Sequence, residues 1–161
     1  MAEAPVSSRR NAPALAAWIL LCFVPAFVGA FSRPGDWYDS LNKPAWNPPS
    51  WIFGPVWTTL YLLMGIAAWR VWRRGGFAAQ ACPLRLFLLQ LAVNALWTPV
   101  FFGLQQIGPA LAVLLTLVAL VSLTVHAFWR VDRPAALMLT PYLGWGLFAA
   151  VLNATLWMMN R

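Results

Sequence analysis

Amide and indole side chains inside apolar segments are the residues of most chemical interest in this chain. Gln90 and Asn94 are four positions apart and Trp97 follows three positions later, so a helix would place all three on one face. A polar group in hydrocarbon must find a partner there, because no water is available to pair with it. This face therefore predicts either a polar contact between helices or one wall of an internal cavity.

A second stripe of aromatic and polar residues lies near the C-terminal end. It recurs at steps of three and four residues and consists of Tyr142, Trp145, Ala149, Leu152 and Asn153. Trp57 adds an indole within an earlier apolar segment. Such groups often join helices without any ligand, but their convergence from three segments favours a pocket. The expected lining includes Trp57, Trp97, Trp145, Gln90, Asn94 and Asn153.

The segment 32–47 separates two apolar stretches and differs from both in composition. It holds aromatic side chains, two prolines, two acids and Lys43, and two further prolines follow it directly. Long ordered loops are more often binding elements than spacers. We expect this loop to form a stiff lid over the pocket. The alternative is a cluster of interfacial aromatic residues that rests among lipid headgroups.

The composition defines the elements that must position these residues. The chain has 161 residues, of which 61% are hydrophobic and 9% charged, and its mean hydropathy is +0.68. These values exclude an ordinary soluble domain. We expect an all-α membrane protein with a single domain, residues 1–161, that forms a bundle of five transmembrane helices. The expected helices span 12–31, 48–72, 84–103, 107–129 and 134–159.

Local signals refine these helices. Pro25 should kink the first one, because it removes a backbone donor within the helix. Asn47 is the expected N-cap of the second, with Pro48 and Pro49 in its first turn. The pair Gly75–Gly76 should end that helix at its far side.

The basic residues predict the orientation. Of the eleven, only Arg33, Lys43 and Arg161 lie on the side of the 32–47 loop. The positive-inside rule therefore places the N-terminus in the cytoplasm, in a bacterial cell membrane and most simply the inner one. The net charge of +7 fits basic residues that set the orientation in the membrane. No long basic run indicates nucleic acid as a partner.

Several kinds of chemistry have no readable residues here. No Asp or Glu lies inside an expected span, which disfavours proton-coupled transport. Cys22 and Cys82 lack the spacing of a disulfide framework or a metal site, and His126 is expected to be interfacial or structural. We expect no catalytic residue and no metal. The tryptophans near helix ends, Trp51 among them, are expected to form interfacial belts.

Three motifs carry a family resemblance. WYDSLNKPAWNPPSWIFGPVWTTLYLLMG (37–65), LQLAVNALWTPVFFG (89–103) and PYLGWGLFAAVLN (141–153) together resemble the translocator protein and tryptophan-rich sensory protein family. The resemblance implies a five-helix bundle, commonly a homodimer, whose pocket binds porphyrins, sterols and synthetic benzodiazepine-type ligands. It implies no cofactor other than porphyrin or haem as a ligand. It also leaves the outer membrane open as the location.

The resemblance assigns roles to positions of this sequence. Trp57 and Asn94 match residues that make polar contacts to ligand, and Trp37 and Tyr38 match aromatic residues that cover the pocket. Trp57 and Trp145 also match tryptophans implicated in light- and oxygen-dependent porphyrin breakdown, so a porphyrin-degrading enzyme is an alternative function. The matching wall positions are Trp51, Gln90, Trp97, Trp145, Ala149 and Leu152.

One position departs from the family pattern. Animal members carry a cholesterol motif late in the last helix, but Ala154 stands here in place of its tyrosine, and no basic residue follows before Arg161. A sterol-binding protein is therefore a weaker alternative. A porphyrin fits better, because its broad π face can stack on indoles and its carboxylates could meet Arg33 or Lys43 at the mouth of the pocket.

Overall fold

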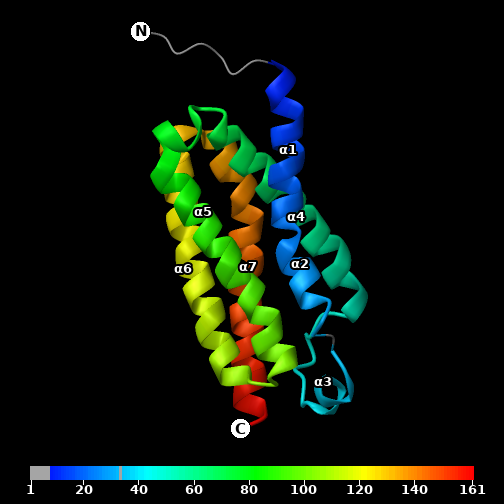
Figure 1. The fold of residues 1–161 in the computed structure, drawn as a ribbon. Coiled ribbons are helices and arrows are strands. Elements are labelled where there is room, and N and C mark those ends of the chain that lie inside the picture. The colour runs from blue at the N-terminus through cyan, green and yellow to red at the C-terminus, as the bar shows by residue number, and fades with distance from the viewer. Residues whose placement is uncertain (1–7, 33) are drawn as a thin grey trace.

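The computed structural model describes residues 8–32 and 34–161, and the side chains from Asn11 onward within these ranges. The described chain is a bundle of long helices (Figure 1). Five segments are long and apolar enough to cross a membrane, which confirms the expected all-α, five-helix fold. They are α1 (Ser8–Cys22) with α2 (Val24–Gly29), α4 (Phe53–Trp72), α5 (Gly76–Thr98), α6 (Ile107–Val131) and α7 (Arg133–Met159).

The first span is broken where proline predicts a kink. α1 ends at Cys22, Phe23 makes a tight turn whose N–H donates to the Leu20 carbonyl (3.1 Å), and Pro25 lies in the first turn of α2. Proline lacks the N–H that would continue the helical pattern, so the chain restarts the helix there instead. The span then ends at Gly29, two residues before the expected limit at residue 31.

The expected start of the second span is wrong. Asn47 does not cap a helix, because its Nδ2 donates to the Pro48 carbonyl (3.2 Å) and its Oδ1 accepts from the Tyr38 hydroxyl (3.4 Å). Pro49 is extended, with ψ of 143°, and helix begins only with the turn Ser50–Ile52 before α4. A residue that precedes proline avoids the helical region, so Pro48 cannot start a helix in front of Pro49.

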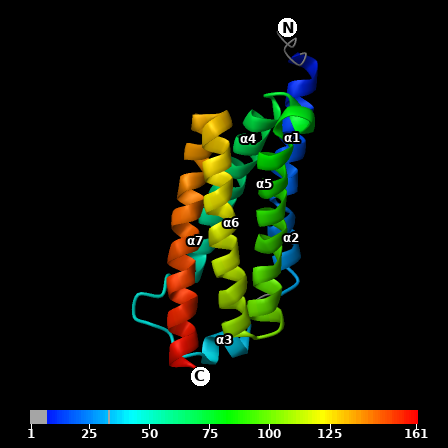
Figure 2. The ribbon, with the colours of Figure 1, turned by 90° about the vertical axis from the view of Figure 1, so that its left-hand side faces the viewer.

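The third span is longer than expected. α5 begins at Gly76 rather than near residue 84, directly after Gly75 (φ 111°), so most of the 73–85 linker is helical. Its first turns bend at Gln80, which has non-helical φ and ψ of −118° and 34°. At its other end α5 widens into a π-helical turn, Pro99–Gly103. A short loop then reverses the chain into α6, which runs beside α5 as expected (Figure 2).

The helices form a ring. α1 packs on α4, α4 on α7, α7 on α6, α6 on α5, and α5 on α2. The α1–α4 contact is especially close at Gly65, where an added Cβ would lie 2.7 Å from the Ile19 Cα. The start of α1 and the C-terminus lie at opposite ends of the bundle, as five crossings require (Figure 1).

The loop 32–47, described except for residue 33, forms the lid. It contains the short helix α3 (Asp36–Ser40) and lies at the same end of the bundle as the C-terminus (Figures 1 and 2). Asn160, just after α7, pairs with the backbone of Asn42 through two hydrogen bonds of 2.8 and 2.9 Å. The Trp46 ring meets Phe148 edge to face, with 6.0 Å between centroids. The lid is therefore fastened to α7 at these two points, and its Tyr38 ring also packs on Phe102 at the end of the third span, with 5.3 Å between centroids.

Candidate ligand pocket

Two cavities lie beneath the lid and share a wall. The outer cavity, next to the lid, has a volume of about 460 Å³, and the inner cavity, deeper in the ring, about 360 Å³. Pockets of this size hold small organic ligands. Lid residues Tyr38, Asp39 and Asn47 border the outer cavity, whereas α2 and α6 contribute only to the inner one. The residues common to both linings are Phe53, Trp57, Thr98, Trp97, Trp145 and Ala149.

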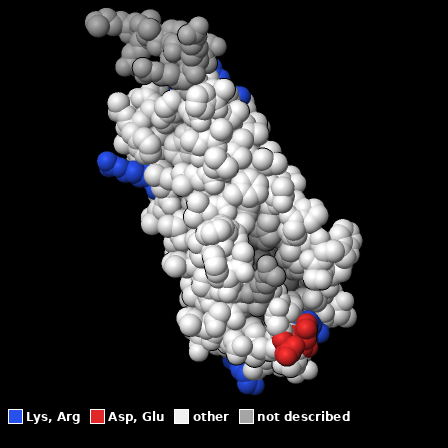
Figure 3. Space-filling model, turned by 45° about the vertical axis from the view of Figure 1, so that its right-hand side comes forward, with Lys and Arg blue, Asp and Glu red and all other residues white. Residues whose placement is uncertain are grey.

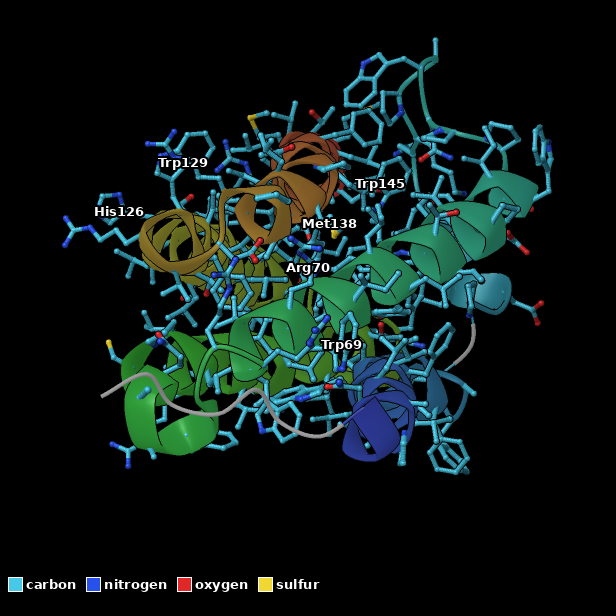
Figure 4. All side chains as sticks on the ribbon, turned by 90° about the horizontal axis from the view of Figure 1, so that it is seen from above. Trp69, Arg70, His126, Trp129, Met138 and Trp145 are labelled. Atoms are coloured by element: carbon cyan, nitrogen blue, oxygen red, sulfur yellow. The ribbon has the colours of Figure 1, made fainter. Side chains whose placement is uncertain are left out.

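Three of the six residues in the shared wall are indoles, and they come from three different helices. The Trp57 ring on α4 stacks on Tyr61 at a centroid distance of 5.2 Å. Trp145 on α7 meets Phe53 edge to face at 5.8 Å. Trp97 on α5 completes the set. Figure 4 shows Trp145 on the side of α7 that faces α4, whereas His126 and Trp129 project from α6 away from the bundle. The Trp97 ring stacks on Phe101 at 5.1 Å, so each of the three indoles is held in position by another aromatic ring.

A chain of hydrogen bonds crosses the bundle below the shared wall. The Tyr61 hydroxyl donates to Asn94 Oδ1 (3.3 Å), Asn94 Nδ2 donates to the Tyr142 oxygen (2.6 Å), and the Tyr142 hydroxyl donates to Gln90 Oε1 (3.0 Å). These bonds link α4, α5 and α7. The amides therefore join helices to one another, and Asn94 and Tyr142 also line the inner cavity. The polar stripe therefore both joins helices and borders a cavity.

A second amide organises the outer cavity. Asn153 Oδ1 accepts a hydrogen bond from the Trp97 indole N–H (3.2 Å), and its Nδ2 donates to the Ile107 carbonyl (2.9 Å). Asn153 is thus fixed between α5 and the start of α6. The indole N–H that would be costly in hydrocarbon is satisfied by the protein itself.

Most residues predicted to bind a ligand lie around these cavities. Trp57, Trp97, Trp145 and Ala149 line both. Asn94 and Tyr142 line the inner cavity, and Tyr38, Leu152 and Asn153 line the outer one.

Three predicted residues lie outside the cavity linings. Trp51 is 72% exposed on the turn before α4, which fits the expected belt position and not a wall position. Gln90 is 1% exposed and supports the wall from behind through Tyr142. Trp37 packs edge to face on Phe101 (5.8 Å) and so anchors the lid instead of covering the cavity.

The charged groups expected at the mouth are differently placed. Lys43 Nζ donates to the Asp39 and Leu41 carbonyls (3.0 and 3.2 Å), so it braces the lid backbone. Arg33 lies outside the described residues. Burial raises the pKa of the Tyr38 phenol more than its hydrogen bond to Asn47 lowers it, so this hydroxyl stays protonated as a donor. The mouth presents polar neutral groups beside Asp39.

Sequence reasoning missed several lining residues. Tyr61 follows Trp57 by four positions, a spacing that could have identified it as part of the same face. Phe23, in the turn before α2, and Pro25 of α2 border the inner cavity, and Leu114 and Leu117 border it from α6. α6 is mostly apolar, and only a few exposed polar side chains, Ser122, His126 and Arg130 among them, mark its outer face, so its sequence gives little signal for the cavity-facing leucines.

The fold and the site together define a multi-pass membrane protein that encloses an aromatic pocket under a lid. The chain belongs to the TspO/MBR family, whose model matches residues 17–158. It is 46% identical over 136 residues to the tryptophan-rich sensory protein of Cereibacter sphaeroides, covering 84% of each chain. It is 42% identical over 149 residues to protein CrtK of Rhodobacter capsulatus (90% of this chain, 91% of that one). It is 44% identical over 147 residues to the translocator protein of Bos taurus (88% and 87%).

Proposed function

We propose that this protein binds porphyrins and related flat, largely apolar molecules in the paired cavities beneath the lid, as a membrane receptor or carrier. The observation that carries this proposal is the shared wall, where Trp57, Trp97 and Trp145 adjoin both cavities. Relatives named sensory protein and translocator protein support a role in sensing or moving a ligand.

The chemistry of the walls suits a tetrapyrrole. Offset stacking on indoles contributes about 0.5–1.5 kcal/mol per aromatic pair beyond the buried area. The apolar walls would take the macrocycle, and the neutral polar groups of the mouth, Tyr38, Asn47 and Ser50, would lie near its carboxylates. Two cavities with a common wall allow a broad molecule to occupy more than one of them.

A light-dependent porphyrin-degrading activity is the second candidate function. Trp57 and Trp145 line both cavities, so a bound porphyrin would lie beside two oxidisable indoles. Under this alternative, light and oxygen are required and product accumulates over many turnovers.

Sterol binding through the late α7 motif is not part of our proposal, because Ala154 supplies no hydroxyl. The homodimer implied by the family resemblance is part of it, and cross-linking in a bilayer tests it.

A fluorescence titration with protoporphyrin tests the binding proposal. In darkness, tryptophan fluorescence should be quenched saturably and reversibly. The double variant Trp57→Phe, Asn94→Ala should bind at least about tenfold more weakly, because it loses an indole contact and a polar contact worth ~1 kcal/mol each. Trp51→Phe is the matched control, since that ring is exposed outside the cavities. Unchanged quenching in the double variant would refute the pocket assignment.

Illumination of the same samples separates receptor from enzyme. A receptor or carrier returns the porphyrin absorption spectrum unchanged after release of the ligand. A degrading enzyme converts many porphyrins per protein, and that conversion should fall in Trp57→Phe and Trp145→Phe. If the protein neither binds in darkness nor converts in light, both functions are excluded.

A further inference from the structure

A second, chemically different cavity lies at the end of the bundle opposite the lid. It has a volume of about 290 Å³ and is lined by Arg70, Arg73, Arg74 and Asp132. The arginines come from the last turn of α4 and the residues just after it, and Asp132 directly precedes α7. Figure 4, which views the molecule from this end, shows Arg70 directed into the space between α4 and α7.

Asp132 organises this cavity. Its Oδ1 accepts from the Ala135 N–H (2.9 Å), which caps α7, and from Arg70 Nε (3.1 Å). Its Oδ2 accepts from Arg70 Nη2 (3.2 Å) and Arg74 Nη2 (3.1 Å). Burial alone would raise the pKa of this carboxyl, but the Ala135, Arg70 and Arg74 hydrogen bonds outweigh it and hold the pKa below its usual value. The carboxylate is therefore charged and its oxygens are fully used.

One carboxylate cannot balance three guanidinium groups. Among the described residues, the ion pairs of Asp132 involve Arg70 and Arg74, and no carboxylate pairs with Arg73. The Arg73 guanidinium lies 4.7 Å from the centroid of the Trp69 ring, which orients it without neutralising it. Arg74 uses one nitrogen for Asp132, and its side chain is 59% exposed. The cavity thus has a net positive charge and free, oriented donors.

The free donors match a phosphate. Guanidinium groups present forked N–H donors that suit phosphate oxygens, and basic pockets between transmembrane helices are typical sites for anionic headgroups. Trp69, Trp72 and Trp129 occupy the same end of the bundle, where indoles normally mark headgroup depth. We propose that this cavity binds the phosphate of an anionic lipid headgroup, with Arg73 and Arg74 as donors and Asp132 holding Arg70 in place.

Lipid retention tests this site. The full-length protein is purified in detergent, titrated with phosphatidylglycerol or phosphatidylcholine, and examined by native mass spectrometry. Phosphatidylglycerol should bind more tightly than phosphatidylcholine, and Arg73→Gln should weaken it about fivefold, as expected for one arginine at a headgroup. Arg161→Gln is the matched control, because that guanidinium also lies over an indole, 5.4 Å from the Trp157 centroid, but at the lid end. The control should retain the lipid.

Three outcomes would overturn the proposal. Phosphatidylglycerol could bind Arg73→Gln as tightly as it binds the natural sequence. It could also bind the natural sequence no more tightly than phosphatidylcholine does. Alternatively, inorganic phosphate alone could occupy the cavity and displace the lipid completely, which would assign the site to a soluble anion. Arg73 is exposed and outside the ion pairs, so thermal unfolding of Arg73→Gln should match that of the natural sequence.

Discussion

Asn160 fastens the lid to the end of α7 through two hydrogen bonds. Its Oδ1 accepts from the Asn42 N–H (2.8 Å) and its Nδ2 donates to the Asn42 carbonyl (2.9 Å). Each hydrogen bond contributes about 0.5–1.5 kcal/mol net. Asn160→Ala should therefore lower the free energy of lid opening by ~1–2 kcal/mol. The backbone amide of residue 42 should then exchange its hydrogen about 5- to 30-fold faster.

Hydrogen exchange read by mass spectrometry measures this effect without any ligand. Asn42→Ala is the matched control, since Asn160 pairs with the backbone of residue 42 and not with its side chain. That variant should exchange like the natural sequence. If Asn160→Ala leaves exchange in the lid unchanged, or if Asn42→Ala accelerates it equally, the two hydrogen bonds do not hold the lid.

Three further substitutions test packing, charge and the buried network. Gly65→Ala should destabilise the fold by ~1–3 kcal/mol through overpacking against α1, whereas Gly144→Ala, with nothing within 4 Å, should not; thermal unfolding of both decides this. Asp132→Asn keeps a helix cap but loses the ion pairs, and should cost ~1–2 kcal/mol at neutral pH. Interactions hold the folded-state pKa of Asp132 below 3.8. The charged carboxylate therefore stabilises the fold above that pH, and this stabilisation is lost as the pH falls through the folded-state pKa. In this acidic range, the unfolding temperature of Asp132→Asn should depend less on pH than that of the natural sequence. Tyr142→Phe leaves two buried amides without their common partner and should cost ~1–3 kcal/mol, visible as a lower unfolding temperature.

The spans and the lid could be predicted from the sequence because hydropathy and helical period are local signals. The amide and indole stripes also follow from local spacing, and all their residues except Gln90 line a cavity from α5 or α7. Helix boundaries depend instead on backbone geometry. The effect of Pro49 on Pro48 moves the start of α4, and Gly75 with Gly76 starts α5 well before its apolar run.

Contacts distant in sequence were beyond prediction. Nothing in the pattern pairs Arg70 with Asp132, which is 62 positions away, because each alone resembles an ordinary interfacial charge. The position of Trp51 could not be predicted either, because a tryptophan at this point of the sequence fits both an interfacial belt and a pocket wall. The turn Ser50–Ile52 before α4 leaves its side chain exposed. The family resemblance placed it on the wall, and the geometry of this chain does not.

Filling the shared wall tests the central claim most directly. Ala149 lines both cavities, so Ala149→Phe should occupy the space that a porphyrin would need and weaken protoporphyrin quenching in darkness by at least about tenfold, as a loss of roughly 1.4 kcal/mol or more. Val151→Phe, on the same helix but 58% exposed, should bind like the natural sequence. Equal affinity in Ala149→Phe and the natural sequence would contradict binding in these cavities.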